Sequence, residues 1–90
     1  MKKHSSDLLI RYKKAKGTLE AIILMIESGS YCVDIMQQNL AVIGLLKSAH
    51  QHLMADHLNS CFKTAMQTRN EEKQKKMISE ILAVTHLLNK

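Results

Sequence analysis

The sequence predicts an all-α protein: a three-helix protomer with a long central helix that pairs with a second copy in an antiparallel dimer. Its 90 residues contain no proline and only three glycines, a composition that favours helix almost throughout. Hydrophobic residues make up 46% of the chain, more than one small three-helix protomer can easily bury. Oligomerisation is the usual way to cover such a surplus. We therefore expect a single domain over residues 1–90 that is stable as an oligomer.

The first helix is predicted from about Leu8 to Ile26. Ser5, Ser6 and Asp7 can cap its start, and Gly29 can end it. Apolar residues at alternating steps of four and three predict a coiled-coil-like seam along it. This seam contains Leu8, Tyr12, Ala15, Leu19, Ile22 and Ile26.

The second helix is predicted to begin at Ser30 or Tyr31 and to extend to about Met66. Its stripe consists of Cys32, Met36, Asn39, Ile43, Leu46, His50, Leu53, His57 and Cys61. Three potential metal ligands therefore occupy the two ends of one seam. The third helix follows a polar hinge at residues 67–70 and covers about Glu71 to Leu88, with Asn70 as its cap. Its apolar stripe contains Met77, Ile81, Val84 and Leu88.

The spacing of the three ligands predicts a site shared between two chains. His57 and Cys61 are four residues apart, so they lie on one face of a helix. Cys32 lies about 37 Å from His57 if the helix is continuous at 1.5 Å per residue, so it cannot join them within one chain. An antiparallel second copy brings Cys32 to the other pair, with a two-fold axis near Gly44. The missing side chain of Gly44 would allow a close crossing there.

Two thiolates and one imidazole suit Cu(I) or Zn(II) and do not suit Mg(II) or Ca(II). Three ligands without an evident fourth favour trigonal Cu(I), because zinc normally takes four. The alternative is that each cysteine is simply a core residue. Nothing in the chain supplies the oriented base and oxyanion site that a Cys/His hydrolase needs. We therefore expect a metal-binding or thiol protein that is not an enzyme.

Positive charge is concentrated at the start of the chain. The net charge is +5, and the first sixteen residues account for it, with Lys2, Lys3, Arg11, Lys13, Lys14 and Lys16 against one acid, Asp7. Arg11, Lys14 and Thr18 form a stripe beside the apolar seam. A clustered basic face predicts phosphate contacts with double-stranded DNA; the alternative is a solvated, solubilising terminus.

The composition also predicts a cytoplasmic protein without a membrane segment. No apolar run reaches the roughly 20 residues that span a bilayer, and no signal peptide is evident. Two cysteines 29 positions apart with a histidine between them are more typical of reduced thiols than of a disulfide.

Three motifs resemble those of the copper-sensitive operon repressor family. The family pattern R-x-x-R-x-x-G-Q-x-x-G-I-x-x-M-I is similar to Arg11–Ile26, in which the second position of the G-Q pair is Thr18. The block Y-C-x-D-I-L-x-Q-x-x-A-V is similar to Tyr31–Val42, and H-L-x-x-C is similar to His57–Cys61. The spacing from Arg11 through Cys61 has no gaps.

This resemblance implies an all-helical dimer that assembles into a flat tetramer, represses transcription and releases operator DNA on binding its inducer. It implies that Cys32, His57 and Cys61 bind Cu(I). It places Tyr31 at a position that supports the ligands, and Glu80 at the acid that communicates with the ligand histidine. It also implies a role in DNA binding for basic residues, here Arg11, Lys14 and Lys47, with Lys13 and Lys16 beside them.

Other members of the family sense other inducers, which leaves alternatives to Cu(I). Nickel and cobalt sensors use nitrogen donors near the N-terminus, and His4 is out of register for that role. Persulfide sensors lack the middle histidine, which is His57 here, and formaldehyde sensors lack the last cysteine, which is Cys61. We expect Cu(I), with a persulfide or thiol-redox sensor and a Ni(II) or Zn(II) sensor as alternatives. Glu20 and Leu24 replace usual basic residues, which would also suit a helical protein-interaction module without DNA binding.

Overall fold

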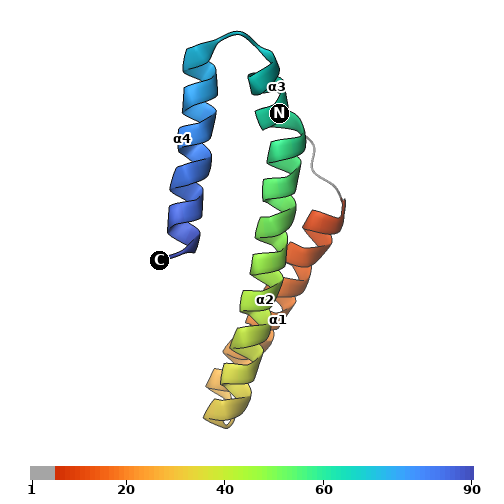
Figure 1. Ribbon diagram of the computed structural model, residues 1–90. Coiled ribbons are helices and arrows are strands. Elements are labelled where there is room, and N and C mark those ends of the chain that lie inside the picture. The colour runs from red at the N-terminus through yellow and green to blue at the C-terminus, as the bar shows by residue number, and fades with distance from the viewer. Residues whose placement is uncertain (1–5) are drawn as a thin grey trace. The chain divides into compact units, whose positions relative to one another are not determined.

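The computed structural model describes residues 6–90, and these residues form helices joined by short turns, without a β-strand among them (Figure 1). The helices in order are α1 (Ser6–Glu27), α2 (Cys32–Asp56), η1 (His57–Phe62), α3 (Lys63–Gln67) and α4 (Glu71–Leu88). The predicted all-α fold is therefore confirmed. The chain divides into two compact units, Met1–Met54 and Ala55–Lys90, and each is described by itself.

The turn between α1 and α2 depends on Gly29. This residue has φ = 73°, in the left-handed region that costs little only for glycine. The N–H of Gly29 donates to the Ile26 carbonyl at 3.2 Å, and the N–H of Ser30 donates to the Met25 carbonyl at 2.9 Å. These are the two bonds of a Schellman motif, which satisfies the last carbonyls of a helix. The predicted stop at Gly29 is confirmed, and α2 begins at Cys32, after the turn.

Replacing Gly29 with alanine is expected to lower the free energy of unfolding by about 1–2 kcal/mol. A methyl group at this position would meet no heavy atom within 4 Å, so the cost comes from the backbone conformation alone. Urea unfolding at matched protein concentration measures it. Gly17→Ala is the control, because that site is equally open but lies inside α1, where alanine is favoured over glycine by about 0.5–1 kcal/mol. Equal stability of Gly29→Ala and the natural protein would contradict this account.

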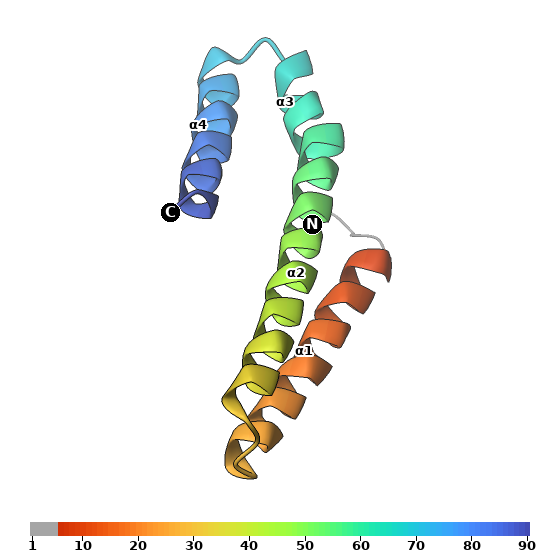
Figure 2. The ribbon, with the colours of Figure 1, turned by 60° about the horizontal axis from the view of Figure 1, so that its bottom comes forward.

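In the first unit, α1 lies alongside α2 (Figures 1 and 2). Ala15 and Ala49 are 2% and 0% exposed, and such small side chains allow two helices to approach closely. Tyr12 and Leu19 belong to the predicted seam of α1 but are exposed. The positions that alternate with the buried ones are instead half-buried: Arg11, Thr18 and Met25. The inward face of α1 is therefore rotated relative to the predicted seam.

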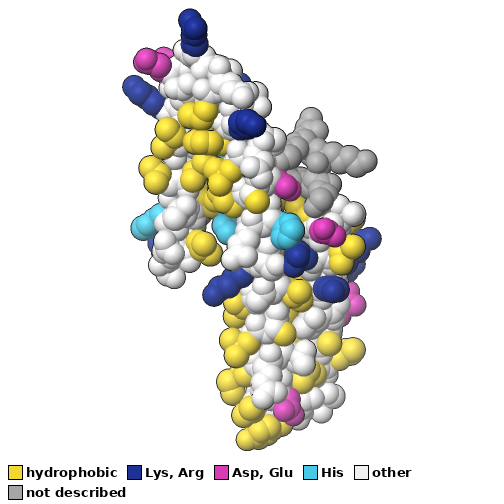
Figure 3. Space-filling model, turned by 45° about the vertical axis from the view of Figure 1, so that its right-hand side comes forward, with side chains coloured by type: hydrophobic (Ala, Val, Ile, Leu, Met, Phe, Trp, Pro, Cys, Tyr) yellow, Lys and Arg dark blue, Asp and Glu magenta, His cyan; other side chains and the backbone are white. Residues whose placement is uncertain are grey.

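The predicted seam of α2 lies largely at the surface of the single chain. Met36 is 55% exposed, and Ile43 and Leu46 are about 40% exposed; Figure 3 shows apolar side chains at the surface of this unit, in its lower part. Five hydrophobic residues are buried in the described chain, and three of these are alanines. So small a core contributes little hydrophobic stabilisation. Among the described residues of the first unit, Met36, Ile43 and Leu46 of this stripe stay exposed.

The second unit contains η1, α3 and α4. Side-chain hydrogen bonds stabilise the turn before α4. The side chain of Asn70 accepts a hydrogen bond from the Lys73 N–H at 3.1 Å. The side-chain amide of Gln74 donates to the Met66 and Thr68 carbonyls. The predicted cap and the predicted range of the third helix are both confirmed. Met77 and Ile81 continue the half-buried face that begins at Gln74.

The helix predicted to extend to about Met66 is three consecutive segments, α2, η1 and α3, and it ends at Gln67. α2 is the longest helix, with 25 residues, and it passes through Gly44 without a break. Within the described residues, no helix is long and apolar enough to cross a membrane.

Candidate metal and DNA-binding site

His57 and Cys61 lie on a π-helical segment. The segment η1 covers His57–Phe62, between the α-helical residues Asp56 and Lys63. A π-helix forms i→i+5 hydrogen bonds and often occurs at functional sites. Ser60 supports it locally, because its hydroxyl donates to the Asp56 carbonyl at 2.8 Å, and Oγ also lies 3.9 Å from Sγ of Cys61. Both candidate ligands are half-buried.

The sequence contains a signal for this segment that the predicted uniform helix missed. The stripe of the second helix alternates steps of four and three residues until Leu53, but then takes two successive steps of four, to His57 and to Cys61. One extra residue in a helical repeat must be absorbed by a change in winding. The π-helical segment accommodates that extra residue, and the two candidate ligands, His57 and Cys61, both lie on this segment.

Cys32 is the first residue of α2, and its side chain is exposed. The carbonyl of the preceding residue, Tyr31, accepts hydrogen bonds from the Asp34 and Ile35 N–H groups. The N-terminal end of a helix carries partial positive charge, which stabilises an anion such as a metal-bound thiolate. Both cysteines are free thiols. Cys32 belongs to the first unit, and Cys61 to the second.

Within residues 6–90, no group of three or more His, Cys, Asp or Glu side chains is close enough to hold a metal ion. Cys32, His57 and Cys61 are nevertheless a soft-to-borderline set of two sulfurs and one nitrogen, which fits Cu(I) by its chemistry. His4 lies outside the described residues.

The two predicted supporting residues are both exposed in the protomer. The Tyr31 side chain is 69% exposed. Glu80 is exposed on α4 and lies outside the half-buried face formed by Gln74, Met77 and Ile81. Their roles beside the ligands remain predictions.

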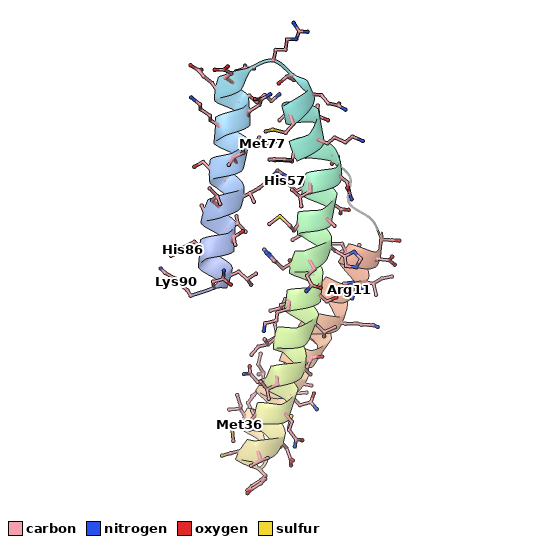
Figure 4. All side chains as sticks on the ribbon, in the orientation of Figure 1. Arg11, Met36, His57, Met77, His86 and Lys90 are labelled. Atoms are coloured by element: carbon pink, nitrogen blue, oxygen red, sulfur yellow. The ribbon has the colours of Figure 1, made fainter. Side chains whose placement is uncertain are left out.

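The basic residues of the first unit fall into two groups. Lys13, Lys14, Lys16 and Lys47 are exposed, as expected for phosphate contacts. Arg11 is half-buried and donates a hydrogen bond from Nη1 to Ser48 Oγ at 2.5 Å, where α1 meets α2 (Figure 4). The side chain of Arg11 therefore reaches across to the other helix, whereas that of Lys14 is exposed. A role of Arg11 in DNA binding remains a prediction. Glu20 and Leu24 are exposed on α1.

Comparison with known proteins identifies the class to which these features belong. The family described as "Metal-sensitive transcriptional repressor" matches residues 4–86. A copper-sensing transcriptional repressor CsoR of Bacillus subtilis is 34% identical over 82 residues, which are 91% of this chain and 78% of the relative. The chain belongs to the metal-sensitive transcriptional repressor family. This family comprises repressors, so the expectation that the chain is not an enzyme is confirmed.

Two further comparisons add to this assignment. A copper-sensing transcriptional repressor CsoR of Mycobacterium ulcerans is 45% identical over 58 residues, 64% of this chain and 50% of that protein, so the chain spans about half the length of this relative. The crystal structure of the copper-sensing repressor CsoR with Cu(I) from Geobacillus thermodenitrificans has a TM-score of 0.86 at 23% identity. That likeness covers 100% of this chain and 95% of the other, and it supports the helical fold.

Proposed function

We propose that this protein is a Cu(I)-responsive repressor that binds operator DNA without copper and releases it when Cu(I) binds. One observation carries the proposal: the free thiols of Cys32 and Cys61 and the imidazole of His57 are ligand types that bind Cu(I), yet among residues 6–90 no three His, Cys, Asp or Glu side chains come together as a metal site. The ligand set is suited to Cu(I), and copper-sensing repressors are among the relatives. A repressor of this kind acts in the cytoplasm, where the chromosome lies.

The site is completed by an antiparallel homodimer. Cys32 of one protomer joins His57 and Cys61 of its partner, and the two-fold symmetry makes two equivalent sites. The apolar stripe of α2, which its own chain leaves exposed, covers the same stripe of the partner. Dimers then associate into a tetramer, as the family resemblance implies. Tyr31 and Glu80 support the ligands from the protomer surface.

Bound Cu(I) supplies bonds that link two protomers. The protein's own residues do the rest: exposed Lys13, Lys14, Lys16 and Lys47 contact phosphates, and the helices hold them at a fixed spacing. A ligand that favours one arrangement of the dimer changes the affinity for DNA by the same factor as DNA changes the affinity for the ligand. This reciprocity defines the test.

Paired titrations test the proposal. Competition with a Cu(I) chelator is expected to show about one tight site per protomer, and copper is expected to weaken binding of an operator duplex by about ten- to hundredfold. His57→Ala is expected to leave DNA affinity without copper intact and to abolish the response. Fluorescence anisotropy of labelled DNA measures both. If the metal-free protein does not bind duplex DNA even at low salt, the repressor proposal is wrong.

The same titrations separate the alternatives. A persulfide or thiol-redox sensor would respond to an inorganic polysulfide, whose sulfane sulfur oxidises the thiols and is reduced to sulfide. The product is a covalent link between Cys32 and Cys61 of different chains, which mass spectrometry detects. A Ni(II) or Zn(II) sensor would respond to those ions and not to Cu(I). The exposed Leu24 and Glu20 on α1 favour one further candidate, a helical module that binds another protein. That candidate predicts no DNA binding at any salt concentration.

A further inference from the structure

A hydrogen bond from the charged side chain of Arg11 to Ser48 links the two helices of the first unit. Nη1 of Arg11, on α1, donates to Ser48 Oγ, on α2. Among the described residues, it is the one side-chain hydrogen bond found between α1 and α2. Ser48 directly precedes Ala49, which is fully buried. The hydrogen bond therefore joins α1 to α2 next to a buried position of α2.

The guanidinium group is also partly removed from water. Nε of Arg11 is buried and has no hydrogen-bond partner, although buried polar groups are normally paired. Leaving such a donor unpaired is unfavourable. The guanidinium group makes its hydrogen bond through Nη1 instead, to Ser48. Arg11 is half-buried, whereas the neighbouring Lys13 and Lys14 are exposed.

Two exposed lysines lie close in sequence to the two residues of this hydrogen bond. Lys14 follows Arg11 by about one helical turn on α1, and Lys47 directly precedes Ser48 on α2. We propose that Arg11 and Ser48 are positioning residues for DNA binding: their hydrogen bond fixes the spacing between Lys14 and Lys47, so that both can contact phosphates of one duplex. This inference rests on the proposed repressor function. It assigns a role to Ser48 and gives Arg11 a supporting role in place of a phosphate contact.

Salt dependence distinguishes the two roles for Arg11. Removing one phosphate contact lowers the slope of log affinity against log salt by about 0.9. A positioning residue instead lowers affinity without removing a counterion-releasing contact, so the slope stays near that of the natural protein. Arg11→Met keeps an unbranched apolar stem of similar length to that of arginine and removes both the charge and the hydrogen bond. Lys14→Met is the matched control on the same helix and is expected to lower the slope by about 0.9.

The experiment measures binding of one fixed, mixed-sequence duplex by fluorescence anisotropy at a series of salt concentrations. The natural protein is compared with five variants: Ser48→Ala, Ser48→Thr, Arg11→Met, Lys14→Met and the double variant Arg11→Met/Ser48→Ala. Ser48→Ala is expected to weaken DNA affinity about tenfold and to leave the salt slope unchanged. The reason for this magnitude is that losing one hydrogen bond to a charged group corresponds to about a tenfold change in an equilibrium constant. Ser48→Thr retains the hydroxyl and is expected to restore binding. In the double variant the two effects should not add, because they remove the same interaction.

Controls separate positioning from loss of folding. Circular dichroism reports helix content for each variant, and Thr85→Ala removes a comparable hydroxyl bond within α4 and is expected to leave DNA affinity unchanged. Three results would overturn the inference: Ser48→Ala binding like the natural protein, additive effects in the double variant, or a slope lowered by about 0.9 in Arg11→Met. Failure of the natural protein itself to bind would refute the repressor function instead.

Discussion

Mixing two inactive variants is expected to restore copper binding. Cys32→Ala and Cys61→Ala should each lose the tight Cu(I) site, because each lacks one of three ligands. If the site spans two protomers, a mixed dimer of these variants contains one site in which all three ligands are natural and one in which two are missing. With random pairing half of the dimers are mixed, so about a quarter of the sites return.

The arrangement of the ligands makes this outcome specific to a shared site. Cys32 lies at the start of α2, whereas Cys61 lies on η1 in the other compact unit. A site within one chain would be broken in every protomer of the mixture, and no tight site would return. A thiol switch that links the two cysteines would also gain a natural pair in the mixed dimer, but it would not bind Cu(I) reversibly.

Chelator competition on co-refolded variants provides the measurement. Each variant refolded alone is the baseline, and a mixture of Cys32→Ala with the double variant Cys32→Ala/Cys61→Ala is the negative control, because it lacks Cys32 in both chains. Refolded natural protein shows that the procedure preserves the site. A mixture of the two single variants that stays at the baseline, while forming mixed dimers, would show that the ligands do not combine across protomers.

The parts of the fold that the sequence predicted well are those with local signals. Asn70 caps α4, and Gly29 ends the turn after α1 with a positive φ; both depend on the side chain or the conformation of a single residue. The range of α4 follows from such signals without knowledge of the rest of the chain. The same holds for the presence of the basic cluster, because charge is read directly from composition.

The inward face of α1 could not be predicted from its pattern, because two apolar stripes overlap on this helix. Leu8, Ala15 and Ile22 belong to both, and the choice between Tyr12 and Arg11 as their neighbour depends on what packs against them. In the single chain Ala49 of α2 is fully buried, and Arg11 donates a hydrogen bond to Ser48, the neighbour of Ala49. The other stripe, with Tyr12 and Leu19, stays exposed. Its pattern is typical of a helix with two partners.

The candidate site was predicted in its residues but not in its backbone. The soft ligand types and their spacing are visible in the sequence, whereas a π-helical turn depends on how one extra residue is absorbed. Both His57 and Cys61 lie on this π-helical segment, η1. Moving either ligand by one residue would therefore change the winding of the helix as well as the position of the ligand.

A bulky residue at position 44 is expected to dissociate the dimer while leaving the protomer folded. Gly44 is in the interior of α2 and exposed, and a methyl group there would meet no heavy atom of its own chain within 4 Å. Nothing in the protomer therefore requires glycine, which is less favourable than alanine in a helix by about 0.5–1 kcal/mol. We expect a second α2 to approach closely here, because the predicted two-fold axis passes near this residue.

Gly44→Leu places the added side chain twice in one interface, once from each protomer. Overpacking costs about 1–3 kcal/mol for each such insertion, so dimerisation should weaken by about 2–6 kcal/mol. Sedimentation equilibrium over a range of concentrations measures this change, and circular dichroism should show retained helix. Gly17→Leu is the matched control, because Gly17 is also exposed, helical and free of contacts within 4 Å; it should dimerise normally. Because a site shared between protomers needs both of them, Gly44→Leu should also lose tight Cu(I) binding at concentrations where it is monomeric. A Gly44→Leu variant that dimerises like the natural protein would place the axis elsewhere along α2.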